Sequence, residues 1–204
     1  RLQYGCWTYC GLMSEISRGV VAVIRTDNSE WAYNLAKAFD GTSVIAIEIT
    51  MTVPKALDVI HRLIDEGVQR IGGGTVRTLE QVESLAKMKA SFAVSPHSDE
   101  RIIKRCVELN LPVTPGTLTP SEMVRAMQWG ATSAKVFPIN SVGGLSYVKY
   151  VLEPLPDIPL VVSGGVTPEE VQKYLDLGCV GVCMGGALWD EKITASGNIA
   201  LMNE

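Results

Sequence analysis

Short runs rich in β-branched residues recur along the chain at intervals of roughly 20 to 26 residues, and this repeat restricts the fold more than any other feature. One interval holds a strand, a helix and two loops, so the repeat is typical of βα units. Eight runs occur, at residues 19–25, 43–50, 69–73, 91–95, 111–115, 132–137, 158–163 and 179–184. Amphipathic segments such as 29–39 and 55–66 separate them. The alternation predicts a parallel sheet covered by helices.

Eight parallel strands can form either an open doubly wound sheet or a closed barrel. The Gly-x-Gly-x-x-Gly pattern of dinucleotide-binding open sheets is missing after the first run, and its absence favours an eight-stranded (β/α)8 TIM barrel. Residues 119–122 (TPSE) and 167–170 (TPEE) repeat one helix start, with a capping threonine, a proline at the first helical position and a glutamate two residues later. These capping boxes predict where two of the loops end.

The composition is that of one ordinary globular domain. A length of 204 residues suits a single barrel over 1–204, with 1–18 as a lead segment or helix and 190–204 as an eighth helical segment. A net charge of −4 produces no extended positive field that would attract nucleic acid. No apolar run approaches the roughly 20 residues needed to span a bilayer. The first residues also lack the order of a secretory signal, so we expect a cytoplasmic protein.

Metal and disulfide chemistry are both disfavoured. The five cysteines are an odd number and do not resemble a disulfide framework, so we interpret them as reduced thiols. Only two histidines occur, and we expect His61 to lie on the solvent face of the second helical segment. A metal-dependent aldolase or isomerase is therefore unfavoured, and we predict that the protein needs no metal and no cofactor.

Two charged residues fall within runs that are otherwise apolar. In the run 43–50 the isoleucines suit the helix layer, so the two-residue period of a strand turns Glu48 and Thr50 toward the barrel axis. In the run 132–137 the same argument turns Ser133, Lys135 and Phe137 inward. The purely structural interpretation is a buried Lys–Glu ion pair, but such pairs rarely stabilise a protein more than apolar packing of similar volume. A functional pair is the better hypothesis.

An inward lysine is what Schiff-base chemistry requires. Burial disfavours the charged ammonium, and the free amine is the form that attacks a carbonyl carbon. The resulting iminium withdraws electrons, so a carbon–carbon bond two atoms away can break if another group moves protons, and Glu48 is placed to do so. A direct ion pair would hold Lys135 in its charged form, so we expect the two to communicate through water or substrate.

Two glycine pairs follow the last two runs. Ser163, Gly164 and Gly165 end one run, and Gly185 and Gly186 end the other, where barrels commonly bind phosphate with backbone N–H groups. The alternative is that paired glycines only permit tight turns. Two pairs at corresponding positions favour the phosphate site.

The order of these motifs resembles the class I 2-keto-3-deoxy-6-phosphogluconate (KDPG) and 4-hydroxy-2-oxoglutarate (KHG) aldolases, which are (β/α)8 barrels. The matching segments are 20–25 (VVAVIR), 47–50 (IEIT), 72–76 (GGGTV), 94–96 (VSP), 115–116 (PG), 134–138 (AKVFP), 163–166 (SGGV) and 184–186 (MGG). The resemblance covers roughly residues 19 to 189.

The resemblance implies a role for each matching residue. Lys135 would form the Schiff base and Glu48 would be the acid–base group. Thr75 would bind the keto-acid carboxylate and Arg25 would be the active-site arginine, while the two glycine pairs with Ser163 would cradle a phosphate. Further substrate-binding positions are Thr52, Pro96 and Phe137. A homotrimer, a phosphorylated 2-keto acid as substrate and a place in carbohydrate metabolism of the Entner–Doudoroff type are also implied.

Three positions depart from the pattern of the family. Thr52 occupies the place of an arginine found in the phosphogluconate-type enzymes, which weakens the expected recognition of the substrate carboxylate. His97 replaces a glycine and adds a titratable group, and Ala187 replaces a hydroxyl-bearing residue beside the last glycine pair. The galactonate-type relatives also lack the arginine, so this substitution leaves the choice of substrate open.

The leading hypothesis is cleavage of KDPG to pyruvate and glyceraldehyde 3-phosphate, of KHG to pyruvate and glyoxylate, or of both. The alternatives are a 2-keto-3-deoxy-6-phosphogalactonate aldolase and a non-catalytic barrel that binds sugar-acid phosphates. A phosphate-sugar isomerase or epimerase would share the late glycines but would need no inward lysine. The scattered tryptophans offer no stacking surface for nucleic acid.

Overall fold

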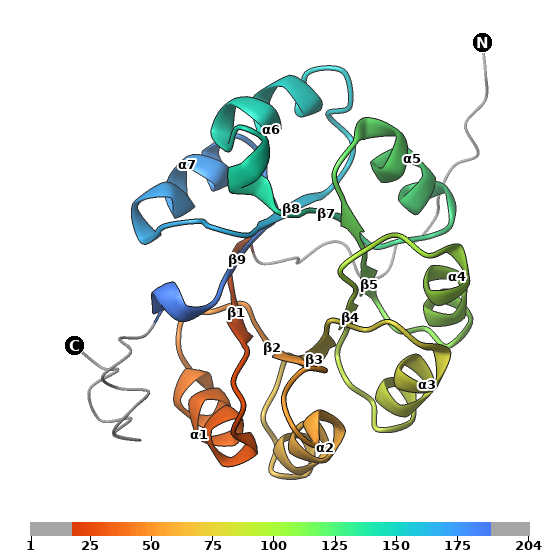
Figure 1. Ribbon diagram of the computed structural model, residues 1–204, viewed down its shortest axis with the longest axis vertical. Helices are drawn as coiled ribbons and strands as arrows, with labels where there is room; N and C mark the ends of the chain where they lie inside the picture. The colour runs from red at the N-terminus through yellow and green to blue at the C-terminus, as the bar shows by residue number, and fades with distance from the viewer. Residues whose placement is uncertain (1–17, 189–204) are drawn as a thin grey trace.

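A parallel β-barrel surrounded by helices is the architecture of the computed structural model, which describes residues 18–188 (Figure 1). The strands are β1 Gly19–Ile24, β2 Ala46–Thr50, β3 Ile71–Gly74, β4 Ala93–Val94, β5 Val113–Thr114, β6 Gly116–Thr117, β7 Ala134–Val136, β8 Leu160–Ser163 and β9 Gly181–Met184. The helices are α1 Ser29–Phe39, α2 Ala56–Asp65, α3 Leu79–Lys87, α4 Glu100–Glu108, α5 Pro120–Gln128, α6 Leu145–Leu152 and α7 Val171–Asp176. Three 3-10 turns also occur, η2 Ile139–Val142, η3 Pro168–Glu170 and η4 Gly186–Leu188.

The sheet is continuous around the barrel, in the order β5-β4-β3-β2-β1-β9-β8-β7-β6. The ends of this order, β5 and β6, are consecutive pieces of one stretch of chain that is interrupted at Pro115. On one side the N–H of Gly116 donates to the carbonyl of Ser95 (2.9 Å), and on the other the N–H of Lys135 donates to the carbonyl of Pro115 (2.9 Å). Hydrogen bonds to both neighbours therefore close the barrel across this interrupted strand.

The expected barrel is confirmed, with one correction to the number of strands. All eight predicted runs contain a strand, but the fifth was expected to end at Pro115 and continues to Thr117 as β6. Proline has no N–H to donate, so the ladder breaks there and nine strands result. The lead segment predicted for 1–18, except Arg18, and the helical segment predicted for 190–204 lie outside the described residues.

Apolar side chains fill the layer between strands and helices. Ile47 and Ile49 of β2 are 2% and 0% exposed and belong to one hydrophobic cluster with Leu63 of α2. Ala134 and Val136 of β7 belong to a second cluster, which also contains Val148 of α6. The predicted orientation of both strands is confirmed, because residues that flank Glu48 and Lys135 point outward and the period of two sends those two side chains inward.

Side-chain caps mark where the helices begin. The hydroxyl of Thr119 accepts from the N–H of Glu122 (3.3 Å), and the carboxylate of Glu122 accepts from the N–H of Thr119 (2.7 Å), so the predicted capping box of α5 is confirmed. At the second predicted box, the carboxylate of Glu170 accepts from the N–H of Thr167 (3.0 Å), but a 3-10 turn precedes α7. Among residues 18–188, no helix has the length and apolar character needed to cross a bilayer.

We predict that Thr119→Ala lowers the free energy of unfolding by about 1 kcal/mol, because it removes the side-chain acceptor of the Glu122 N–H in the first turn of the helix. Urea denaturation with an unchanged slope would measure the loss. Thr119→Ser keeps the hydroxyl oxygen and serves as the matched control. A Thr119→Ala protein as stable as the serine variant would contradict a stabilising role of the cap.

Candidate active site

Glu48 and Lys135 both lie inside the barrel. Their residues are 3% and 7% exposed, although each carries an ionisable group. Glu48 comes from β2 and Lys135 from β7, and each strand is buried along its whole length apart from a half-buried residue at the start of β2. The inward orientation expected of both side chains is confirmed.

A glycine makes room for the carboxylate of Glu48. A methyl group built on Gly74 of β3 would lie 1.8 Å from Oε1 of Glu48, far inside van der Waals contact. Gly74 does not have a positive φ, so the requirement for glycine here is steric and not conformational. The three successive glycines at 72–74 thus include one residue whose missing side chain is part of the site.

Burial raises the pKa of the Glu48 carboxyl above its ordinary value of 4.5, and the positive charges of Lys135 and then Arg25 partly offset the effect. Removal of water disfavours the charged form of a carboxyl group, whereas nearby cations favour it. Because the desolvation is the larger effect, Glu48 keeps its proton to a higher pH than an exposed glutamate.

Lys135 is close enough to Glu48 to influence its charge, yet the two are not paired. Among the described residues, no nitrogen–oxygen distance of 4.0 Å or less joins them, and neither polar end has a hydrogen bond. Because no fully buried polar atom there lacks a partner, the polar ends of both side chains retain some accessible surface within the barrel. Nζ of Lys135 lies 5.4 Å from the ring centre of Phe137. The expectation of an indirect connection is therefore supported.

Three predicted substrate-binding residues meet at the carboxyl ends of β1, β2 and β3. Nη1 of Arg25 donates to the hydroxyl of Thr52 (3.4 Å), and Nη2 donates to the hydroxyl of Thr75 (3.3 Å). Parallel strands deliver their carboxyl ends to one rim, which is why residues 50 positions apart in the sequence can meet. Arg25 and Thr52 are exposed and Thr75 is half-buried.

Thr75 has a strained backbone. Its φ is +57°, a region that β-branched residues rarely occupy, and it follows directly after β3. The N–H of Met51 donates to the carbonyl of Gly74 (2.7 Å), which ties this turn to the end of β2. Strain of this kind is characteristic of positions where the chain must aim a functional group. Here it directs the hydroxyl of Thr75 to Arg25.

The two glycine pairs differ in whether the backbone conformation requires glycine. Gly164 and Gly165 have φ values of +99° and +85°, so the turn itself requires glycine there. A methyl group on Gly165 would also come within 2.8 Å of Asn140. Gly185 and Gly186 have no positive φ, and nothing lies within 4 Å of a methyl group built on Gly186. The turn explanation suffices for the first pair, whereas the second leaves an open backbone at the rim.

The remaining predicted residues also lie at the carboxyl ends of strands. Pro96 follows β4, and its carbonyl oxygen would be 2.3 Å from a methyl group on Gly116. Phe137 follows β7 and is 40% exposed, so it stands at the rim, where its ring centre lies 5.4 Å from Nζ of the interior Lys135. Ser163 ends β8 and is half-buried.

Two buried residues near the site, Thr50 and Cys183, were assigned no functional role from the sequence. Thr50 is 0% exposed and bonds to Thr52, although only its inward direction was expected. Cys183 of β9 is close enough to Glu48 and Lys135 to feel their charges, and burial raises the pKa of its thiol to about 12. The thiol therefore keeps its proton at neutral pH. The missing signal for both is spatial proximity, which local periodicity does not contain.

No metal centre is found in the part of the chain that the structure describes, because no three His, Cys, Asp or Glu side chains gather there. His61 pairs with Asp65 one turn later in the chain (3.6 Å) and has a side chain that is 60% exposed, which confirms its predicted place on the solvent face. His97 is exposed after β4.

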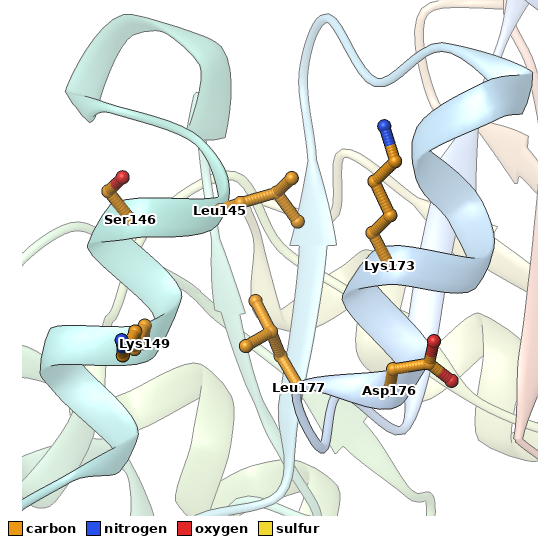
Figure 2. Close-up of a pocket in the computed structure, with 6 residues that line it drawn as sticks. All are labelled: Leu145, Ser146, Lys149, Lys173, Asp176 and Leu177. Carbon is orange, nitrogen blue, oxygen red and sulfur yellow. The ribbon is translucent and has the colours of Figure 1, made fainter.

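A groove of about 410 Å³ lies elsewhere, between α6 and α7 on the outer surface (Figure 2). Leu145, Ser146 and Lys149 come from α6, and the opposite wall is formed by Lys173, Asp176 and Leu177. None of these residues follows the carboxyl end of a strand. The groove is therefore separate from the site at the rim of the barrel.

A parallel α/β barrel with a lysine and a glutamate unpaired in its interior meets the chemical requirements of a Schiff-base lyase. A family model described as KDPG and KHG aldolase matches residues 14–204. The chain belongs to this family, and it is an aldolase, a carbon–carbon lyase.

Similar proteins agree with that assignment. The KHG/KDPG aldolase of Escherichia coli (strain K12) is 32% identical over 82% of this chain and 79% of its own. The 2-dehydro-3-deoxy-6-phosphogalactonate aldolase of the same organism is 33% identical over 83% and 84%. The KDPG aldolase of Legionella pneumophila, solved with pyruvate as a covalent carbinolamine, has a TM-score of 0.83 and 25% identity and covers 92% of this chain and 91% of its own.

We predict that Gly74→Ala lowers the rate of aldol cleavage at least tenfold, since the added methyl group displaces the carboxylate of Glu48 by more than 1 Å. Gly73→Ala is the matched control, because its methyl group would instead meet Leu85 and Met51 outside the barrel interior. Both variants should lose stability, so rates are compared per folded protein. Equal losses of rate in the two variants would argue against the proposed packing of Glu48.

Proposed function

We propose that Lys135 is the nucleophile of this aldolase and attacks the C2 carbonyl of a 2-keto acid. The observation that supports this role is an interior lysine near an interior carboxyl group without an ion pair between them. The amine adds to C2 to give a carbinolamine, and loss of water gives the iminium. The C3–C4 bond then breaks, its electrons enter the iminium to form an enamine of pyruvate, and the C4 hydroxyl loses its proton as the aldehyde forms.

Glu48 is the group that moves protons in this scheme. Its carboxyl lies inside the barrel with a raised pKa, so it keeps its proton to a higher pH than an exposed glutamate and can serve as a proton donor. It donates a proton for the loss of water from the carbinolamine. It then accepts the C4 hydroxyl proton and returns a proton to the enamine carbon, after which water releases pyruvate and regenerates the amine.

The carboxylate of the keto acid binds at the rim formed by Arg25 and Thr75. The guanidinium after β1 and the hydroxyl after β3 offer a charge and a hydrogen-bond donor to one planar anion. Pro96 and Phe137 flank the substrate at the ends of β4 and β7. This arrangement orients C2 toward Nζ of Lys135.

The far end of the substrate extends over the carboxyl ends of β8 and β9. Ser163 with Gly164 and Gly165 presents one edge, and Gly185 with Gly186 presents the open backbone that a phosphate needs to approach N–H groups closely. Ala187 contributes no hydroxyl there, so backbone groups carry this recognition.

The proposed reaction is cleavage of KDPG to pyruvate and glyceraldehyde 3-phosphate, of KHG to pyruvate and glyoxylate, or of both. A second candidate is cleavage of 2-keto-3-deoxy-6-phosphogalactonate, because Thr52 stands where the phosphogluconate-type enzymes have arginine. Pyruvate release from the two phosphorylated epimers, their unphosphorylated forms and KHG separates the candidates. Binding of a phosphorylated acid without pyruvate release would instead indicate a barrel that has lost turnover. From the resemblance we also propose a homotrimer, and from the composition of the sequence a cytoplasmic location.

We predict that borohydride reduction in the presence of pyruvate adds one pyruvate-derived mass to Lys135, because reduction converts the iminium to a stable secondary amine. Intact mass and peptide mapping would locate the addition. Lys135→Ala should lose both labelling and turnover, since the nucleophile and the electron sink are removed together. Lys149 on the outer surface provides a control, as Lys149→Ala should label like the wild type. Labelling at another lysine would disprove the assignment.

We predict that Glu48→Gln lowers the rate by about 10² to 10⁴, the usual contribution of a positioned acid–base group. Its folded state should also respond differently to pH. In the wild type, the folded carboxyl keeps its proton above the ordinary pKa of 4.5, so stability falls as pH rises from there through the raised folded pKa. The variant has no such loss, so its stability relative to wild type should increase over that range. Thermal denaturation at several pH values measures this difference. The same difference in melting temperature between the two proteins at every pH would rule out the raised pKa.

A further inference from the structure

Thr50 is the buried end of a chain of hydrogen bonds that reaches the rim of the site. It is 0% exposed and occupies the last position of β2. Its hydroxyl donates to the carbonyl of Ile24 in β1 (3.2 Å), and its oxygen is 2.8 Å from the hydroxyl oxygen of Thr52. Thr52 in turn receives a hydrogen bond from Arg25. Hydrogen bonds thus connect four groups one after another: the carbonyl of Ile24, the hydroxyls of Thr50 and Thr52, and the guanidinium of Arg25.

Counting protons fixes the direction of this chain. A threonine hydroxyl has one proton and two lone pairs. The proton of Thr50 is committed to the carbonyl of Ile24, so in the bond between the two hydroxyls Thr52 must be the donor. The only proton of Thr52 therefore points into the protein, and toward the rim Thr52 can only accept.

The consequence is a division of roles between the two rim threonines. Thr52 offers a lone pair to Nη1 of Arg25 and has no proton left for a substrate carboxylate. Thr75 accepts from Nη2 and, among the described residues, has no acceptor for its own proton. Of these three side chains, Arg25 and Thr75 can still donate to an anion, and the fork of Arg25 is held on both sides.

We infer that Thr50 is a positioning residue which, by taking the proton of Thr52, makes Thr52 an acceptor that holds Arg25 beside Thr75 to bind the carboxylate of the keto acid. The inference rests on the proposed function, because it assigns that carboxylate to this rim. It adds a residue that never touches the substrate, and it changes the role of Thr52 from a ligand of the substrate to a support for Arg25.

The test measures pyruvate binding through covalent trapping. Wild-type and variant proteins are reduced with borohydride for a fixed short time at increasing pyruvate concentrations, and intact mass gives the labelled fraction. Thr50→Val should raise the half-saturating pyruvate concentration about fivefold, the change expected from one net hydrogen bond. The labelled fraction at saturating pyruvate should stay unchanged, because Lys135 is not part of the chain.

Conservative and matched variants separate positioning from damage to the fold. Thr50→Ser keeps the hydroxyl and should restore binding to within about twofold of wild type. Thr42→Val removes a hydroxyl that also donates to a main-chain carbonyl, that of Phe39 (2.7 Å), but precedes β2 at the opposite end of the strands. It should leave pyruvate binding unchanged.

A double variant decides whether Thr50 acts through Thr52. Thr52→Val should produce the same rise as Thr50→Val, and the double variant should produce no more than either one. Additive rises, or a half-saturating concentration in Thr50→Val that equals the wild-type value, would overturn the inference. If Thr50→Val folds poorly, Thr52→Val at the exposed end still decides, because wild-type binding in that variant also overturns it. Failure of the wild type to trap pyruvate would refute the proposed function instead.

Discussion

Removal of water from the carboxyl group of Glu48 is the constraint on which the site depends. Burying an ionised carboxylate inside a barrel costs free energy, and no ion pair with Lys135 offsets that cost here. Lys135 and Arg25 lie near enough to favour the charge, but desolvation is the larger effect and the pKa rises. A direct pair would hold both groups in their charged forms. Because no such pair forms, the carboxyl of Glu48 is not held in its charged form by Lys135.

The space for this arrangement is made by the neighbouring strand. Gly74 lies where any side chain would collide with Glu48, and the next residue, Thr75, takes a positive φ as the chain leaves β3. One segment of backbone thus provides room for the acid–base group and aims a hydroxyl at Arg25. Loss of side-chain packing at the glycine and strain at the threonine both disfavour folding, so the stability must come from elsewhere in the molecule.

That stability comes from the layer outside the barrel. The two hydrophobic clusters between strands and helices contain the residues that flank Glu48 and Lys135, so the packing that holds the strands also orients the reactive side chains. The strand interrupted at Pro115 is held by hydrogen bonds on both sides, which closes the barrel around the site. The rim, in contrast, is held by the longer hydrogen bonds of Arg25 to Thr52 (3.4 Å) and Thr75 (3.3 Å).

Much of this could be predicted from the sequence, because it depends on short-range patterns. The repeat of βα units, the capping box at Thr119 and the inward direction of Glu48 and Lys135 follow from periods of two residues in strands and from local capping chemistry. The tertiary structure alone decided that β5 and β6 divide at Pro115, that Gly74 leaves space for Glu48, and that Arg25 meets Thr52 and Thr75 at one rim. Each of these features depends on the distance and direction between a residue and a neighbouring strand, which no local pattern contains.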